Sequence, residues 1–127
     1  MQLEKNFKLK EFKCRDGTPV PEELMDNVKL LAKNLQVIRD YIESPLVIIS
    51  GYRTKKYNTR IGGARRSQHM LAKAGDLRTS THTPQELREV IVKLIKEGKI
   101  MKGGVGLYNT FVHYDVRGRN ARWRKIR

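Results

Sequence analysis

The fold class follows from residues 21–50, which read PEELMDNVKLLAKNLQVIRDYIESPLVIIS. Apolar side chains recur at every third or fourth position from Leu24 to Ile42, which predicts a helix over residues 21–42 with one buried stripe. Pro45 prevents this helix from continuing. The β-branched, apolar run at residues 46–50 then predicts a buried strand.

The second half of the chain contains another helix and at least one strand. Thr83 and Glu86 have the spacing of a capping box and Pro84 stands at the first helical position, so a helix should begin near Thr83 and stop at Gly98. Residues 111–117 read as a strand, whereas residues 51–83 lack a long periodic element. Because strands and helices do not alternate regularly, the fold class is α+β.

Length and composition fit a single soluble domain over residues 1–127, and we expect a monomer. The hydrophobic fraction is 39% and the charged fraction is 31%. The longest apolar run, residues 46–49, is far too short to span a membrane, and residues 1–6 do not resemble a signal peptide. The lone Cys14, expected to be buried, excludes an internal disulfide and a cysteine-rich zinc site.

The net charge of +14 comes from two segments. Residues 44–83 and residues 98–127 each hold eight Lys or Arg and a single acid. If the two segments share a face, that face attracts a polyanion such as nucleic acid, an anionic wall polymer or an acidic lipid surface. The basic C-terminal segment 117–127, with six cations and Trp123, fits nucleic-acid stacking, a wall-polymer contact or a simple basic tail. Plain solubility is the alternative.

Two pairs of residues in the chain each combine a histidine with an aspartate. His69 lies seven residues before Asp76, and strand alternation places His113 and Asp115 on one face, with the core residues on the other. Two imidazoles and a carboxylate are donors typical of an open catalytic zinc site. By spacing alone, however, a histidine and an aspartate in a basic protein are more often surface groups or ion-pair partners than metal ligands.

Several longer motifs stand out in the chain: SGYRT (50–54), YN (57–58), IGGA (61–64), SQH (67–69) through AGD (74–76), and FVHYDVRG (111–118). Together they resemble one known family, the zinc-dependent D-Ala-D-Ala carboxypeptidases and endopeptidases called M15 peptidases. The resemblance spans about residues 7–123 and is most specific where a Ser-x-His-x₆-Asp motif is combined with a late Phe-Val-His-x-Asp strand.

The resemblance implies a hedgehog-like α+β fold, in which helices pack on a small, mostly antiparallel sheet and a metal lies in a cleft. It assigns Zn²⁺ to the ligands His69, Asp76 and His113. It also makes Arg53 the residue that binds a substrate carboxylate, which suits the bidentate fork of a guanidinium. Ser67 would be a substrate contact or a partner of a ligand, unless it only forms a turn.

Two positions depart from the family's pattern. Ala72 stands where the family usually has glycine, which costs about 1 kcal/mol if the backbone there needs a positive φ. Thr110 stands three residues before His113, where many relatives carry an acid or a histidine, and it cannot accept a proton near neutral pH. Asp115 is the nearest alternative base, but it equally fits a residue that orients an imidazole or binds Arg117. His82 is a more distant candidate.

The leading hypothesis is a zinc peptidase that hydrolyses peptidoglycan stem peptides as a carboxypeptidase or an endopeptidase, in phage lysis or in wall remodelling. It would be made in the cytoplasm and act at the cell wall, or in the periplasm if a signal was removed. One alternative is a wall-binding module that has lost catalysis, supported by Thr110. The other is a basic nucleic-acid-binding domain, for which the sequence offers no recognition motif.

Overall fold

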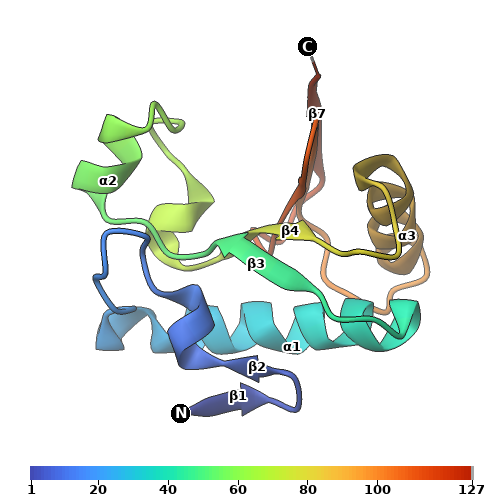
Figure 1. Cartoon of the computed structure of the whole chain (residues 1–127), viewed down its shortest axis with the longest axis horizontal. Coiled ribbons are helices and arrows are strands. Elements are labelled where there is room, and N and C mark those ends of the chain that lie inside the picture. The colour runs from blue at the N-terminus through green and yellow to red at the C-terminus, as the bar shows by residue number, and fades with distance from the viewer. Residues whose placement is uncertain (127) are drawn as a thin grey trace.

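Five strands form the main sheet, in the order β3-β4-β6-β5-β7, and helix α1 runs across one of its faces (Figure 1). This computed structural model describes residues 1–126. A separate two-stranded hairpin precedes the sheet. The elements are β1 (Gln2–Glu4), β2 (Phe7–Lys8), α1 (Met25–Ile42), β3 (Val47–Ser50), α2 (Lys55–Arg60), β4 (Ala74–Arg78), α3 (Pro84–Lys96), β5 (Gly104–Tyr108), β6 (Val112–Asp115) and β7 (Ala121–Lys125), with the 3₁₀ turns η1 (Leu9–Phe12), η2 (Glu22–Leu24) and η3 (Gln68–Leu71).

The first predicted helix is confirmed, although its first turn is a separate 3₁₀ turn, η2, and α1 proper begins at Met25. The predicted stripe is buried, because Val28, Leu31, Leu35 and Ile38 are all completely covered. The helix ends at Ile42, after which Glu43 turns the chain with a φ of 52°. Ser44 precedes Pro45, and the residue before a proline rarely adopts a helical conformation, which explains why α1 ends here.

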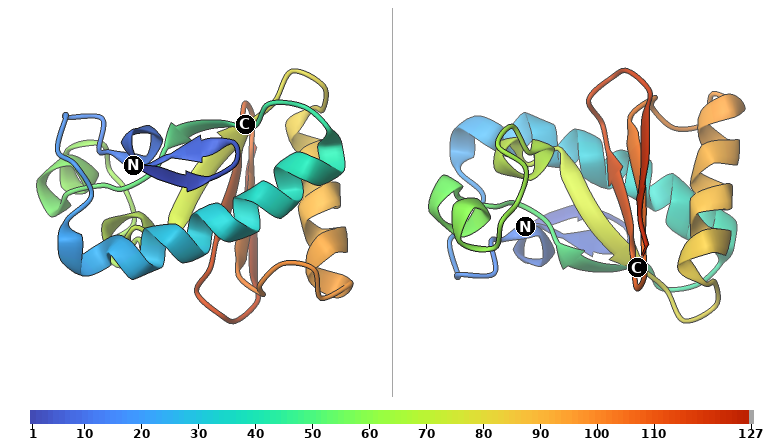
Figure 2. Two further views of the ribbon diagram at one scale, coloured as in Figure 1. Left: turned by 90° about the horizontal axis from the view of Figure 1, so that it is seen from below. Right: turned by 90° about the horizontal axis from the view of Figure 1, so that it is seen from above.

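Helix α3 begins as predicted. The Thr83 hydroxyl accepts a hydrogen bond from the Glu86 N–H, and the Glu86 carboxylate accepts one from the Thr83 N–H. Pro84 occupies the first turn, and Gly98 follows the helix with a φ of 71°. Leu87, Ile91 and Leu94 bury the apolar stripe, so α3 packs against β5 and β6 at the far end of the sheet from α2 (Figure 2).

The predicted strand at residues 46–50 is β3, and it lies at one edge of the sheet. Leu46 and Ile48 are buried, but Val47 is 40% exposed. The prediction of a buried strand is therefore only half correct, because an edge strand presents alternate side chains to solvent. Arg15 closes part of the free edge by donating hydrogen bonds to the carbonyls of Ile49 (2.7 Å) and Ile48 (3.4 Å).

The α+β class is confirmed, but the sheet is mixed. Four strands are antiparallel as expected, whereas β7 pairs with β5 in parallel. The predicted basic segment 117–127 therefore contains a strand and is not simply a tail, because β7 forms the edge of the sheet opposite to β3. Tyr114 and Val112 of β6 join the core with α1 and α3 on one face. Among residues 1–126, no helix has the length and apolar character to cross a bilayer.

Candidate metal centre

Three side chains meet on the sheet face opposite to this core. His69 comes from η3, Asp76 from β4 and His113 from β6, and one ligand atom from each lies within 4.8 Å of the others. Asp76 and His113 are direct partners in the pairing of β4 with β6. The turn that carries His69 is capped by Ser67, whose hydroxyl accepts a hydrogen bond from the His69 N–H at 3.2 Å. Pairing and capping thus bring the three predicted ligands together.

Both imidazoles are held by the ring nitrogen that points away from the group. His69 Nδ1 lies 2.7 Å from the carbonyl of Gly51, which leaves its Nε2 3.3 Å from Asp76 Oδ1. His113 Nε2 lies 2.7 Å from Asp115 Oδ2, which leaves its Nδ1 3.3 Å from the same Asp76 oxygen. Histidines that bind metals usually donate their other N–H to a carbonyl or carboxylate in this way. The residues present therefore fit a metal ion.

Charge and burial act in opposite directions on these groups. Burial lowers the pKa of His69 and outweighs the opposing effect of Asp76. Burial also acts to lower the pKa of His113, but its hydrogen bonds with Asp115 and Asp76 prevail and raise it. Burial acts to raise the pKa of Asp76, yet its contacts with His113 and His69 hold it well below the usual range. Asp76 is thus a carboxylate at neutral pH, ready to bind a cation.

Asp115 is fully buried and both of its oxygens are occupied. Oδ1 accepts hydrogen bonds from the Gly104 N–H and from Arg117, while Oδ2 contacts His113 and the Arg117 guanidinium at 2.8 Å. A Cβ at Gly104 would collide with this carboxylate, so the glycine makes room for it. Burial acts to raise the pKa of Asp115, but the hydrogen bonds from His113 and Arg117 hold it below the usual range.

Arg53 contacts the predicted ligand Asp76 directly. Its Nη2 lies 3.0 Å from Asp76 Oδ2, the oxygen that faces away from the two histidines. Its Nε donates to the Ser50 hydroxyl at 3.1 Å, and its Nη1 donates to Asn58 at 3.3 Å. The side chain is 13% exposed and borders the cleft above the metal group. Arg53 thus fixes Asp76 and keeps two N–H bonds for another partner.

The cleft above the metal group has a volume of about 460 Å³. Residues 61–64, Ser67 and Gln68 line one side, while Tyr108, Phe111 and Trp123 line the other. Arg53 from the first basic segment and Arg117 and Lys125 from the second also line it. The two basic segments therefore do share a face, and that face contains the cleft.

Other predicted candidates lie elsewhere. Thr110 is exposed and is not a lining residue of the cleft, and His82 contacts Thr81 outside it. Cys14 is buried, as expected. The sequence analysis gave no role to Asn58, Tyr108 or Phe111, and it considered Trp123 only as part of the basic C-terminal segment and not as a wall of the cleft. The signal for the aromatic side was the only tryptophan of the chain, together with glycines at 104 and 106 that leave space beside it.

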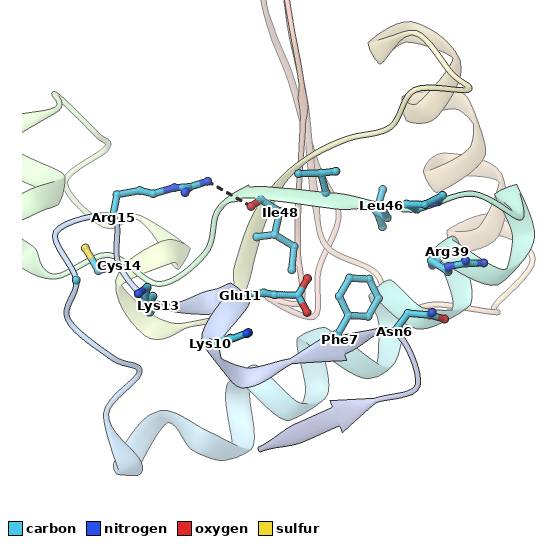
Figure 3. Close-up of a pocket in the computed structure, with 13 residues that line it drawn as sticks. Asn6, Phe7, Lys10, Glu11, Lys13, Cys14, Arg15, Arg39, Leu46 and Ile48 are labelled. Atoms are coloured by element: carbon cyan, nitrogen blue, oxygen red, sulfur yellow. Dashed lines mark hydrogen bonds between the residues drawn. The ribbon is translucent and has the colours of Figure 1, made fainter.

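A second cavity, of about 490 Å³, lies between the N-terminal hairpin and the edge strand β3 (Figure 3). Its charged side chains include Lys10, Glu11 and Arg15, and Figure 3 shows Arg15 reaching the Ile48 carbonyl. It is slightly larger than the first cavity, but it lacks any histidine and contains none of the metal group. The candidate metal group therefore borders the smaller cleft and not this cavity.

Two comparisons with known proteins bear on the family of this chain. No match was found among curated proteins. A family model described as Peptidase M15 matches residues 5–115, which include His69, Asp76 and His113 and end at Asp115. Because this match covers most of the sequence, the chain belongs to the Peptidase M15 family.

Proposed function

We propose that this protein is a zinc metallopeptidase that hydrolyses peptide bonds in peptidoglycan stem peptides. The carrying observation is that His69, Asp76 and His113 converge on the floor of an open cleft in a member of a peptidase family. Two imidazole nitrogens and one carboxylate oxygen are a donor set that suits zinc and leaves a position for water or substrate. When bound, the metal supplies a Lewis acid for the scissile carbonyl and lowers the pKa of water.

The chain's own residues then bind and orient the peptide. Arg53 offers its two remaining N–H bonds to a substrate carboxylate and, through its contact with Asp76, sets the distance between that carboxylate and the metal group. Ser67 accepts a hydrogen bond from the His69 N–H and keeps its own O–H free to donate to the peptide. Both residues border the cleft, so a bound peptide would lie between its two sides.

Of the two roles open to Asp115, the contacts support the positioning of His113. A general base must reach the proton that it abstracts, whereas Asp115 is covered and both oxygens already accept hydrogen bonds. Among the cleft residues that the structure describes, Asp76 is the one carboxylate. We therefore expect the proton of the attacking water to leave through solvent in the open cleft, and the leaving amine to take up a proton from the same solvent.

Charge supports an anionic wall as the place of action. Arg53, Arg117 and Lys125 border the cleft, and Arg65 and Arg66 are exposed beside it. A positive cleft raises the local concentration of an anionic polymer and its rate of association. We propose that the protein acts at the cell wall, where such polymers and the stem peptides occur together.

The proposed function is tested by incubating purified peptidoglycan with the protein and zinc, followed by mass spectrometry of the released fragments. We expect peptide cleavage that stops with a chelator and in the variant His113→Ala. Loss of single amino acids identifies a carboxypeptidase, and loss of cross-links identifies an endopeptidase. A zinc-loaded protein that binds peptidoglycan without cleaving it would instead be a wall-binding module. Steep, salt-sensitive DNA binding without cleavage would favour the nucleic-acid alternative.

A further inference from the structure

Strand β7 brings Trp123 next to the metal group. The whole strand lies outside the part of the chain that the family model matches. Along one line across the sheet, Asp76 pairs with His113, His113 with Gly106, and Gly106 with Trp123. Residues that pair directly project to the same face of a sheet. Trp123 therefore shares the face of Asp76 and His113, with only a glycine between it and His113.

The glycines of β5 give the indole its place. A Cβ at Gly106 would collide with the indole ring of Trp123, and one at Gly104 would come within 3.0 Å of it. Because these positions carry no side chain, the indole lies across β5 and reaches His113, with ring centroids 4.9 Å apart. The wall of the cleft next to His113 is thus an indole.

This indole is held firmly. Its Nε1 donates a hydrogen bond to the Tyr108 hydroxyl at 3.0 Å, and the Arg117 guanidinium lies 5.5 Å from the ring centroid. Tyr108 in turn stacks on Phe111, with centroids 4.4 Å apart. All three aromatic residues line the cleft, and Trp123 is only partly buried, so the wall is both fixed and accessible. A fixed aromatic surface binds apolar groups with little loss of side-chain entropy.

The opposite side of the cleft is also partly apolar, because Ile61 (47% exposed) and Ala64 line it. We infer that Trp123 is a substrate-contacting residue whose indole binds a small apolar side chain of the peptide next to the bond that is cut. This inference rests on the proposed function. It adds Trp123 to the substrate-binding residues and requires that the substrate carry a small apolar side chain next to the bond that is cut. Lys125, on the same side of β7, places a cation at the end of the indole wall.

The test combines kinetics with the fluorescence of the only tryptophan in the chain. Alanine-containing and glycine-containing stem peptides are compared in the wild type, Trp123→Phe and Trp123→Ala. We expect Trp123→Ala to raise KM for the alanine peptide about tenfold, the loss of one aromatic contact, with kcat and zinc affinity nearly unchanged. The KM for the glycine peptide should rise much less in Trp123→Ala. The Trp123→Phe enzyme should bind the alanine peptide with most of the wild-type affinity. Tyr41→Ala, a truncation at an exposed ring on α1, is the matched control.

Fluorescence gives an independent readout of the position of the indole. Co²⁺ bound to the metal group should quench Trp123, and adding alanyl-alanine should change the emission further, whereas glycyl-glycine should not. A Trp123→Ala enzyme with unchanged KM, an equal loss for both peptides, or a zinc affinity that falls with the rate would overturn the inference. A wild type that cleaves no stem peptide would instead refute the proposed function, while the Co²⁺ quenching would still report the place of the indole.

Discussion

At the scale of single residues, the sequence predicted which side chains meet but not what each one does. Strand alternation placed Asp115 beside His113, and the two are in contact at 2.7 Å. Alternation could not tell whether that carboxylate is exposed, because this depends on Gly104 and Arg117 closing over it from other positions. Likewise, the family resemblance assigned Arg53 to substrate, but its contact with Asp76 arises only when β4 lies beside residues 50–53.

The role of Asp115 is tested by the variant Asp115→Asn. The amide keeps the shape but loses the charge that holds His113, so zinc affinity should fall by about 10–100-fold and excess zinc should restore much of the rate. Zinc titration and steady-state kinetics check this. Retained zinc with a loss of roughly 10²–10⁴ in kcat would make Asp115 the base after all. Asp26→Asn, at an exposed acid in the first turn of α1, is the control.

Arg53→Lys should impair both turnover and metal binding. Lysine keeps the charge but cannot contact Ser50, Asn58 and Asp76 at once. We therefore expect kcat/KM to fall by a factor that corresponds to a loss of about 1.5–3 kcal/mol of transition-state stabilisation. Zinc affinity should also weaken, because Asp76 loses a fixed partner. Arg60→Lys, an exposed substitution in the last turn of α2, should change neither quantity. An unchanged kcat/KM would remove Arg53 from the substrate site.

At the scale of elements, local signals predicted the helices well and the sheet less completely. The apolar stripe of α1 and the capping box of α3 are patterns between residues that are near each other in the sequence. The predicted ends of both helices therefore lie within a few residues of the observed ends. Ala72 has a φ of 56°, so the strain of about 1 kcal/mol expected at this position applies. Strand β7 could not be predicted, because its sequence is mostly cationic and its place depends on pairing with the glycine-rich β5.

Glu43 is the other non-glycine residue with a positive φ among those that the structure describes, and it allows a test of helix termination. Glu43→Gly should stabilise the protein by about 0.5–1 kcal/mol, because glycine adopts the left-handed conformation after α1 without steric cost. Thermal unfolding checks the change. The matched control is Glu97→Gly, an exposed position after α3 whose φ is −81°. There glycine only adds freedom to the unfolded chain, so stability should not rise. Equal effects at both positions would contradict the explanation.

At the scale of the whole molecule, charge is distributed by face. The net charge of +14 arises from segments that border the cleft from both sides, whereas residues 1–43 hold equal numbers of acids and bases. Helix α1 belongs to this balanced part and lies on the opposite face of the sheet (Figure 1). The sequence predicted two basic segments but not their shared face, because only the folded sheet brings β7 opposite residues 61–68.

The distribution of charge predicts that binding to an anionic polymer depends more on where the cations lie than on the net charge of the protein. Arg65→Glu with Arg66→Glu, beside the cleft, should weaken binding to an anionic wall polymer about tenfold at low salt, because it reverses the local field. Lys29→Glu with Lys33→Glu, exposed on α1, makes the same change in net charge and should weaken binding far less. Co-sedimentation with the polymer measures both, and the difference should shrink at high salt as screening shortens the range of the field. Equal losses in the two variants would show that the polymer responds to net charge alone, and the cleft would then not be its docking face.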